Sequence, residues 1–226
     1  MRVVIPYTDR NPKSRLAPVL SAAERRAFAR AMLGDVVEAV RSAGHDPELL
    51  LPAPIDIADA DADTTVGVDG VPTTVDDRAL TPAVDAVLDR LGEGVAEVGI
   101  VMADLPLATP TALRRLTAVG GEVGIAPGRG GGTNALVVRD PSFSVDYHGA
   151  SYRDHREAAA AAGLSVGVVD SMRLAPRRRP GPRVAGRRRG RTRRWRRSGR
   201  GPAGIAGDSR TGIRYHDRFC TSTPQI

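Results

Sequence analysis

Two cations lie close together in a polar loop near the amino terminus. Lys13 and Arg15 belong to the segment Asn-Pro-Lys-Ser-Arg-Leu, residues 11–16, which follows the apolar run Arg2–Pro6. Lys13 is the only lysine in the chain, and its compact ammonium differs from the planar guanidinium of arginine. Such a pair can hold a triphosphate against its own charge repulsion. An ordinary solvated basic loop would contain the same residues, and the segment lacks the glycines of a Walker loop.

A carboxylate follows a fully apolar stretch in the middle of the chain. Asp104 comes after Val98–Met102, with one alanine between them. A carboxylate at the mouth of a buried strand is a natural Mg²⁺ ligand for a phosphate substrate. A helix cap or a surface turn is the competing interpretation. We take Asp104 as the candidate metal ligand.

A glycine-rich loop precedes a further strand-like run. Gly130, Gly131 and Gly132 are followed by Thr133 and Asn134. Glycines let backbone amides approach a ligand closely, and the threonine and asparagine offer side-chain hydrogen bonds at the start of the strand. A flexible hairpin turn would contain the same glycines, but the Thr-Asn pair at the strand start favours a binding loop.

The segment Tyr147–Ser151 stands just before a helical pattern. Ser151 is either the N-cap of that helix or a phosphate contact, since helix N-termini favour anions and a capping serine can serve both purposes. His148 and His155 are candidates for proton transfer, because histidine is the side chain suited to it near neutral pH. The sequence shows no partner for either, so we expect ordinary solvent-facing histidines.

These groups need a scaffold that brings strand ends together. Strand-like runs alternate with helical patterns, which predicts an α/β fold with a mostly parallel sheet covered by helices on both faces. In such sheets ligands bind beyond the carboxyl ends of the strands. The expected helices begin with a capping box at Ser21–Glu24, with Thr81-Pro82, with Thr109-Pro110 and at Ser151. Phe28, Met32, Val36, Val37 and Val40 share one face of the first helix.

Charge divides the chain into two parts. Residues 1–172 have a net charge of −8 and residues 173–226 a net charge of +15. The acidic, lysine-poor part resembles the surface of salt-adapted, archaeal-like proteins. No apolar run reaches eighteen residues, and the amino terminus lacks the layout of a signal peptide. With Cys220 as the single cysteine, we expect a cytoplasmic protein without a membrane span.

The motifs together resemble the 2-phospho-L-lactate guanylyltransferase family of coenzyme F-420 biosynthesis. The resemblance rests on V-I-P-Y-x5-K-S-R-L, L-S-x-x-E-R-x-x-F-A-R-A-M-L, A-D-L-P-L, G-G-G-T-N-A-L and Y-H-G-A-S-Y-x-x-H, in this order from Arg2 to about Ala175. It implies a GT-A-like nucleotidyltransferase fold, a Rossmann-like α/β sandwich. The implied reaction transfers GMP from GTP to 2-phospho-L-lactate, giving lactyl-2-diphospho-5'-guanosine and pyrophosphate. Relatives use phosphoenolpyruvate, which stays open as the acceptor here.

The resemblance also implies roles for individual residues. Lys13 and Arg15 match the triphosphate contacts, and Asp104 matches a Mg²⁺ ligand. The three glycines match the nucleotide-binding loop. Four residues match the acceptor's binding site: Thr133, Asn134, His148 and Ser151. A homodimer is expected by analogy with the family.

The chain departs from the family after about residue 175. The family has an Asp-x-Asp motif there that completes the metal site, whereas Pro176–Pro182 reads Pro-Arg-Arg-Arg-Pro-Gly-Pro. Arginine codons of the CGN type, read one base later, become GNC and encode Asp, Val, Ala or Gly. Shifted from Arg177, the frame permits Asp-Val-Asp-Pro-Asp-Leu-Glu-Leu-Leu. We therefore interpret residues 1–175 as the nucleotidyltransferase domain and 176–226 as a disordered or frame-shifted tail.

A genuine basic arm is the alternative interpretation of the tail. Arg-Arg-Trp195-Arg-Arg mixes cations with an aromatic ring, as nucleic-acid-binding arms do. On that hypothesis the chain is a catalytically dead domain that binds DNA or RNA. Binding of nucleic acid is not expected if the tail is frame-shifted.

Overall fold

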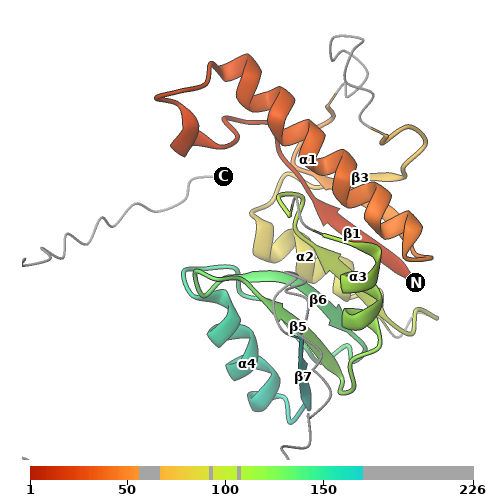
Figure 1. The fold of residues 1–226 in the computed structure, drawn as a ribbon. Helices are drawn as coiled ribbons and strands as arrows, with labels where there is room; N and C mark the ends of the chain where they lie inside the picture. Colours follow the sequence, from red (N-terminus) through yellow and green to blue (C-terminus); the bar gives the residue numbers. More distant parts are fainter. Residues whose placement is uncertain (56–66, 92–93, 106–107, 170–226) are drawn as a thin grey trace, which may run out of the picture. The chain divides into compact units, whose positions relative to one another are not determined.

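A single seven-stranded sheet forms the centre of the described part of the protein. The computed structural model describes residues 1–55, 67–91, 94–105 and 108–169, so the predicted tail of residues 176–226 lies outside it. The elements in chain order are β1 (Arg2–Pro6), η1 (Ser14–Leu16), α1 (Ala22–Ser42), β2 (Asp46–Leu51), β3 (Thr73–Val75), α2 (Leu80–Leu88), β4 (Val98–Val101), α3 (Pro110–Thr117), β5 (Val123–Pro127), β6 (Thr133–Val138), α4 (Ser151–Ala161) and β7 (Val166–Val168) (Figure 1).

The strand order is β3-β2-β1-β4-β6-β5-β7. β1 pairs in parallel with β2 and β4, β2 with β3, and β5 with β7. Only β6 of the described strands runs antiparallel to its neighbours, β4 and β5. The predicted mostly parallel sheet is confirmed, with β6 as the exception. Reversal of β6 has a consequence for the site: its amino end lies on the same sheet edge as the carboxyl ends of β1, β4 and β5.

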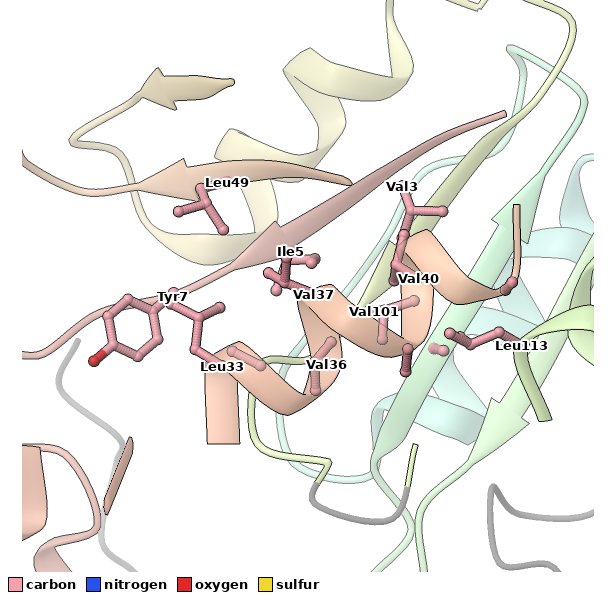
Figure 2. Packing of buried hydrophobic residues seen from close by; sticks show 14 of the residues in the cluster. Val3, Ile5, Tyr7, Leu33, Val36, Val37, Val40, Leu49, Val101 and Leu113 are labelled. Atoms are coloured by element: carbon pink, nitrogen blue, oxygen red, sulfur yellow. The ribbon is translucent and has the colours of Figure 1, made fainter. Parts of the chain in front are cut away.

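Helices cover both faces of this sheet, as predicted. One apolar core joins α1 and α3 to side chains such as Val3, Ile5 and Val101. Figure 2 shows Leu33 of α1 among the side chains of this core. The other core joins α2 and α4 to Val4 and its neighbours. Adjacent residues of β1 thus face opposite cores, which is the two-residue period of a strand. Each fully buried aliphatic side chain contributes about 1.5–3 kcal/mol.

The first helix begins as the sequence predicts but differs in the face that it buries. Ser21 Oγ accepts from the Glu24 amide, and the Glu24 carboxylate accepts from the Ser21 amide, so the capping box is present. Of the five apolar residues predicted to share one helical face, Phe28 does not pack in the core, since the residue is 45% exposed. The helix is longer than the sheet that it covers, and its first turns extend beyond that sheet (Figure 1).

The start of α2 is a second correction. We expected Thr81 to cap this helix, but the N-cap is Ala79 and has no side-chain hydrogen bond. The Thr81 hydroxyl instead accepts from the backbone amide of Tyr147, at 3.1 Å. A long-range contact has therefore replaced the local one. Among the described helices, none is both long and apolar enough to cross a membrane.

Candidate active site

The lysine and the strand-end carboxylate meet at the carboxyl edge of the sheet. Lys13 Nζ lies 3.0 Å from Asp104 Oδ2, although 91 residues separate them. The contact follows from the topology, because Lys13 comes after β1, Asp104 comes after β4, and the two strands are parallel neighbours. The lysine side chain is 23% exposed and the carboxylate 62% exposed. Both groups can therefore be reached by a ligand.

The loop that presents Lys13 has an unusual backbone. Asn11 and Lys13 adopt positive φ angles of 46° and 50°, in the left-handed region that costs a non-glycine residue about 1–3 kcal/mol. Lys13 also begins the short helix η1, since its carbonyl accepts from the Leu16 amide at 2.8 Å. Arg15 lies in η1 with an exposed side chain. The two cations of the predicted pair therefore share one turn.

The glycine loop is the hairpin between β5 and β6. The Gly128 amide donates to the Gly132 carbonyl at 2.7 Å, and the Gly131 amide donates to the Gly128 carbonyl at 3.2 Å. Gly131 has a φ of 85°, and a Cβ at Gly128 would lie 2.8 Å from Asn134 Oδ1. Glycine is thus favoured at position 131 by backbone conformation, and a side chain at position 128 would require Asn134 to move. At Gly130 a Cβ would meet no atom within 4 Å.

Thr133 and Ser151 are brought together where β6 and α4 begin. The Thr133 amide donates to Ser151 Oγ at 3.0 Å, and Ser151 Oγ donates to Thr133 Oγ1 at 3.3 Å. Their residues are only 7% and 5% exposed. Ser151 is not the N-cap of α4, which is Ala150 without a side-chain hydrogen bond. The capping interpretation is therefore wrong, and the serine hydroxyl joins the helix start to the glycine hairpin instead.

His155 is buried, contrary to the solvent-facing histidine that we expected. Its exposed fraction is 0%, its Nδ1 lies 2.9 Å from Thr133 Oγ1, and the Tyr147 ring packs edge-on against it at 4.9 Å. Burial lowers the pKa of His155 from 6.5 to about 4, so the imidazole is neutral at pH 7. Since Thr133 Oγ1 already accepts from Ser151, its own proton is available to Nδ1, which completes a chain of three side chains.

His148 lies apart from this chain, on the surface. Its imidazole is 80% exposed and bonds the Asp146 carboxylate, and that hydrogen bond lowers the pKa of Asp146. A cavity of about 470 Å³ beside it is also lined by Asp154 and Glu157. Carboxylates make this cavity unsuitable for an anionic acceptor. The side chain of His148 is therefore a weaker candidate than the Thr133–Ser151 corner.

The Lys13–Asp104 pair and the Thr133–Ser151 pair lie at the ends of neighbouring strands, β4 and β6. The Met102 amide donates to the Asn134 carbonyl at 3.0 Å, which joins the end of β4 to the start of β6. Asp104 lies two residues after Met102, in the turn that follows β4, and Thr133 precedes Asn134 on β6. Within the described residues, no hydrogen bond connects the Lys13–Asp104 pair to the Thr133–Ser151 pair. The carboxyl edge of the sheet therefore has two corners. The cationic corner contains Lys13, Arg15 and Asp104, and the hydroxyl corner contains Thr133 and Ser151.

With the side chains of the described residues, a divalent cation at this corner would need further ligands from the substrate. Within the described ranges, no group of three or more His, Cys, Asp or Glu side chains is placed to hold a metal ion. Asp104 can supply one exposed carboxylate. Mg²⁺ keeps several waters and is commonly held by one or two carboxylates together with substrate phosphates. The chemistry of this corner suits that mode of binding.

Sequence reasoning missed Arg25, which bonds the Lys13 loop from α1. Its guanidinium donates to Asn11 Oδ1 and to the Pro12 and Leu20 carbonyls at 3.0–3.2 Å. An arginine close to a helix start, where the helix dipole disfavours a cation, was the available signal.

Comparison with known proteins identifies the family. Residues 1–175 match the family model described as "Guanylyl transferase CofC like". Proteins called 2-phospho-L-lactate guanylyltransferase are 57% identical over 175 residues in Haloferax volcanii and 52% identical over 180 residues in Haloterrigena turkmenica. Each match covers 77% of this chain and 78% of the relative.

A solved structure supports the fold. A chain from Desulfovibrio desulfuricans, described as a nucleotide-diphospho-sugar transferase, superimposes with a TM-score of 0.57 at 17% identity. The superposition covers 75% of this chain and 79% of that one. The fold is accordingly the GT-A-like nucleotidyltransferase fold. By its family-model match and its relatives, the chain belongs to the CofC-like family of guanylyltransferases.

Proposed function

We propose that this protein transfers GMP from GTP to 2-phospho-L-lactate, releasing pyrophosphate. The observation that carries the proposal is the Lys13–Asp104 contact of 3.0 Å at the carboxyl edge of the sheet. It places a cation and a candidate metal ligand where nucleotides bind in open α/β sheets. The names of the relatives supply the acceptor and the guanine base.

In the proposed complex the Lys13 loop binds the triphosphate. The Lys13 ammonium leaves the Asp104 carboxylate and donates to the phosphate that becomes pyrophosphate, and Arg15 contacts the same group from the next turn. Charge-assisted hydrogen bonds of this kind contribute about 1.5–3 kcal/mol each. They neutralise charge on the leaving group, and the α-phosphorus is left accessible to in-line attack.

Asp104, freed from Lys13, would hold Mg²⁺ together with the phosphates. The ion would supply charge neutralisation at the reacting phosphorus. Lys13 and Asp104 can separate to bind the substrate and the metal ion, because an exposed ion pair stabilises the fold by only about 0.2–1 kcal/mol. The site can therefore open for substrate at small cost.

The hydroxyl corner is the proposed site of the acceptor's phosphate. Backbone amides of the Gly130–Gly132 turn lie next to the first turn of α4, whose N-terminus favours an anion. The side-chain donors proposed to complete it are the Asn134 amide and the Ser151 hydroxyl, which would turn its single proton from Thr133 Oγ1 to the phosphate. The acceptor's phosphate then attacks the α-phosphorus directly, and no covalent intermediate on the protein is needed.

A substrate comparison tests the proposal. The full chain is incubated with GTP, Mg²⁺ and either 2-phospho-L-lactate or phosphoenolpyruvate, and pyrophosphate and the guanylylated product are measured by coupled assay and mass spectrometry. We expect product with phospholactate, abolished in Asp104→Asn and retained in Asp35→Asn, which removes an exposed carboxylate on α1. Product with phosphoenolpyruvate alone would change the assigned acceptor. Equal activity of the two variants would overturn the role of Asp104.

The sequence after residue 175 bears on the rate that this experiment will find. Pro176–Pro182 contains three arginines and no carboxylate, where the family resemblance places two further aspartates. We therefore expect little or no turnover from the chain as it stands, and recovery when the carboxyl-terminal segment is replaced by the shifted-frame sequence. The substrate comparison is accordingly run with both forms of that segment, and product is expected from the replaced one. Cytoplasmic location and a homodimer remain part of the proposal, and analytical ultracentrifugation measures the latter.

A further inference from the structure

A buried arginine of α1 bonds both sides of the loop that contains Lys13. Arg25 is 8% exposed. Its Nε donates to the Pro12 carbonyl at 3.2 Å, one terminal nitrogen donates to the Leu20 carbonyl at 3.0 Å, and the other to Asn11 Oδ1 at 3.0 Å. Two acceptors precede Lys13 and one follows it. The guanidinium therefore closes the loop by a fork of three bonds.

Helix stability does not explain an arginine at this position. Arg25 lies four residues after the N-cap Ser21, near the end of a helix where a cation opposes the helix dipole. Among the described residues, no carboxylate pairs with its guanidinium. Burying a charge without a counter-charge is costly unless its hydrogen bonds are satisfied. Here the loop supplies all three acceptors, so arginine and loop depend on each other.

The loop needs such support because apolar packing does not provide it. No residue of η1 is buried, and Asn11 and Lys13 hold left-handed backbone conformations. Strained conformations persist only where the surroundings fix them. The acceptors of Arg25 are the side chain of Asn11 and the carbonyl of Pro12, which directly precede Lys13. Its bonds thus act at the strained residues.

We propose that Arg25 is a positioning residue, which holds the 11–20 loop in the conformation that presents Lys13 and Arg15 to a polyphosphate. This rests on the proposed function for its ligand, but the effect on the loop is independent of it. The positive charge of the guanidinium, which no carboxylate of the described ranges neutralises, also adds positive potential beneath the loop, and this potential attracts an anion. A planar fork is required, and a lysine at position 25 cannot make the three bonds.

Three variants of the full chain test this role. Arg25→Met removes the fork, Arg25→Lys keeps the charge, and Arg26→Met is the matched control, since Arg26 is the adjacent, exposed arginine. Amide hydrogen exchange follows Leu16 and Leu20, whose amides bond the Lys13 and Leu16 carbonyls at 2.8 Å. Affinity is measured for GTP and for inorganic triphosphate, well below the melting temperature of each variant.

We expect faster exchange over residues 11–20 in Arg25→Met and Arg25→Lys, with the sheet unchanged, and no effect in Arg26→Met. Affinity for GTP and for triphosphate should fall about three- to tenfold, the cost of ordering a loop on binding. Unchanged loop exchange, or a loosened loop with unchanged affinity, overturns the proposal. If the unsubstituted chain binds neither ligand, the proposed function fails, while loop exchange still decides whether Arg25 holds the loop. Should Arg25→Met not fold, Arg25→Lys provides the same comparison.

Discussion

Replacing Asp104 by asparagine should change GTP affinity in opposite directions with and without Mg²⁺. Without the metal, the Asp104 carboxylate holds Lys13 Nζ at 3.0 Å and repels an incoming phosphate. Two like charges about 4 Å apart repel by about 1 kcal/mol in water. Removing the carboxylate charge relieves this repulsion and frees the lysine. We therefore expect Asp104→Asn to bind GTP about fivefold more tightly in the presence of a chelator.

With Mg²⁺ the sign should reverse, because the variant lacks the carboxylate proposed to hold the ion. Loss of residues that only support a metal ligand typically costs 10–100-fold in metal affinity. Loss of the ligand itself should cost at least about tenfold in affinity for GTP with Mg²⁺. Isothermal titration calorimetry in chelator and in excess Mg²⁺ measures both arms, with Asp35→Asn as the exposed-carboxylate control.

Stability provides the check that the variant has not simply lost its fold. The pair has one side chain 23% exposed and the other 62% exposed, and exposed pairs contribute about 0.2–1 kcal/mol. The melting temperature of Asp104→Asn should therefore fall by no more than about 2–4 °C. Affinity that changes in the same direction in both buffers would refute the reasoning, since it would show that Asp104 acts without a metal.

Three further results are expected. The folded-state pKa of His155, about 4, lies below 6.5, so the free energy of unfolding should be highest above pH 6.5 and should fall as the pH falls toward 4. In urea unfolding, His155→Gln should flatten this dependence of the free energy of unfolding on pH, and His148→Gln should not. Gly131→Ala should destabilise the protein by about 1–2 kcal/mol because the φ angle of Gly131 is 85°, while Gly130→Ala should change the stability by less than about 0.5 kcal/mol. The midpoints of urea unfolding, compared at an unchanged m-value, measure both effects. Sequencing of the gene at codons 175–182 should show a frame in which Arg177 becomes Asp, and codons that cannot encode aspartate there contradict the frame shift.

The part of the site that sequence predicted depends on strands. An apolar run ending in Asp104 and another ending before the Lys13 loop were readable as strands, and parallel strands end on one edge. The contact between Lys13 and Asp104 is then explained by the structure, in which β1 and β4 are neighbouring strands. The neighbour relation itself was not readable, because strand order is set by contacts across the whole sheet rather than by local pattern.

What sequence could not predict depends on long-range polar contacts. His155 stands between Asp154 and Arg156 on α4, so its sequence neighbours give no sign of burial. The rings that pack against it are Phe143 and Tyr147, which belong to the preceding loop. Thr81 has the residue type of a cap, yet it bonds the Tyr147 amide instead. The short edge strand β3 was missed because Thr73 and Val75 are exposed, which leaves only one of its three side chains partly facing the core. For His155 and Thr81 a tertiary contact overrode a local preference, and for β3 the local pattern was too weak to read.

The Lys13 loop is stabilised by polar contacts and the core by apolar packing, so substitutions in the two regions should affect phosphate binding and stability differently. Below the loop, α1 packs through fully buried side chains such as Leu33 and Val36. The loop itself is held by polar contacts from two arginines of the same helix: Arg25 with its three bonds, and Arg30, whose Nη2 lies 3.3 Å from Asp9 Oδ2. A hydrogen bond contributes about 0.5–1.5 kcal/mol to the free energy of unfolding, or about 1.5–3 kcal/mol when one group is charged, whereas truncating a buried leucine to alanine costs about 2–5 kcal/mol. Substitutions in this layer should therefore weaken phosphate binding well before they lower the melting temperature, whereas substitutions at Leu33 should do the reverse.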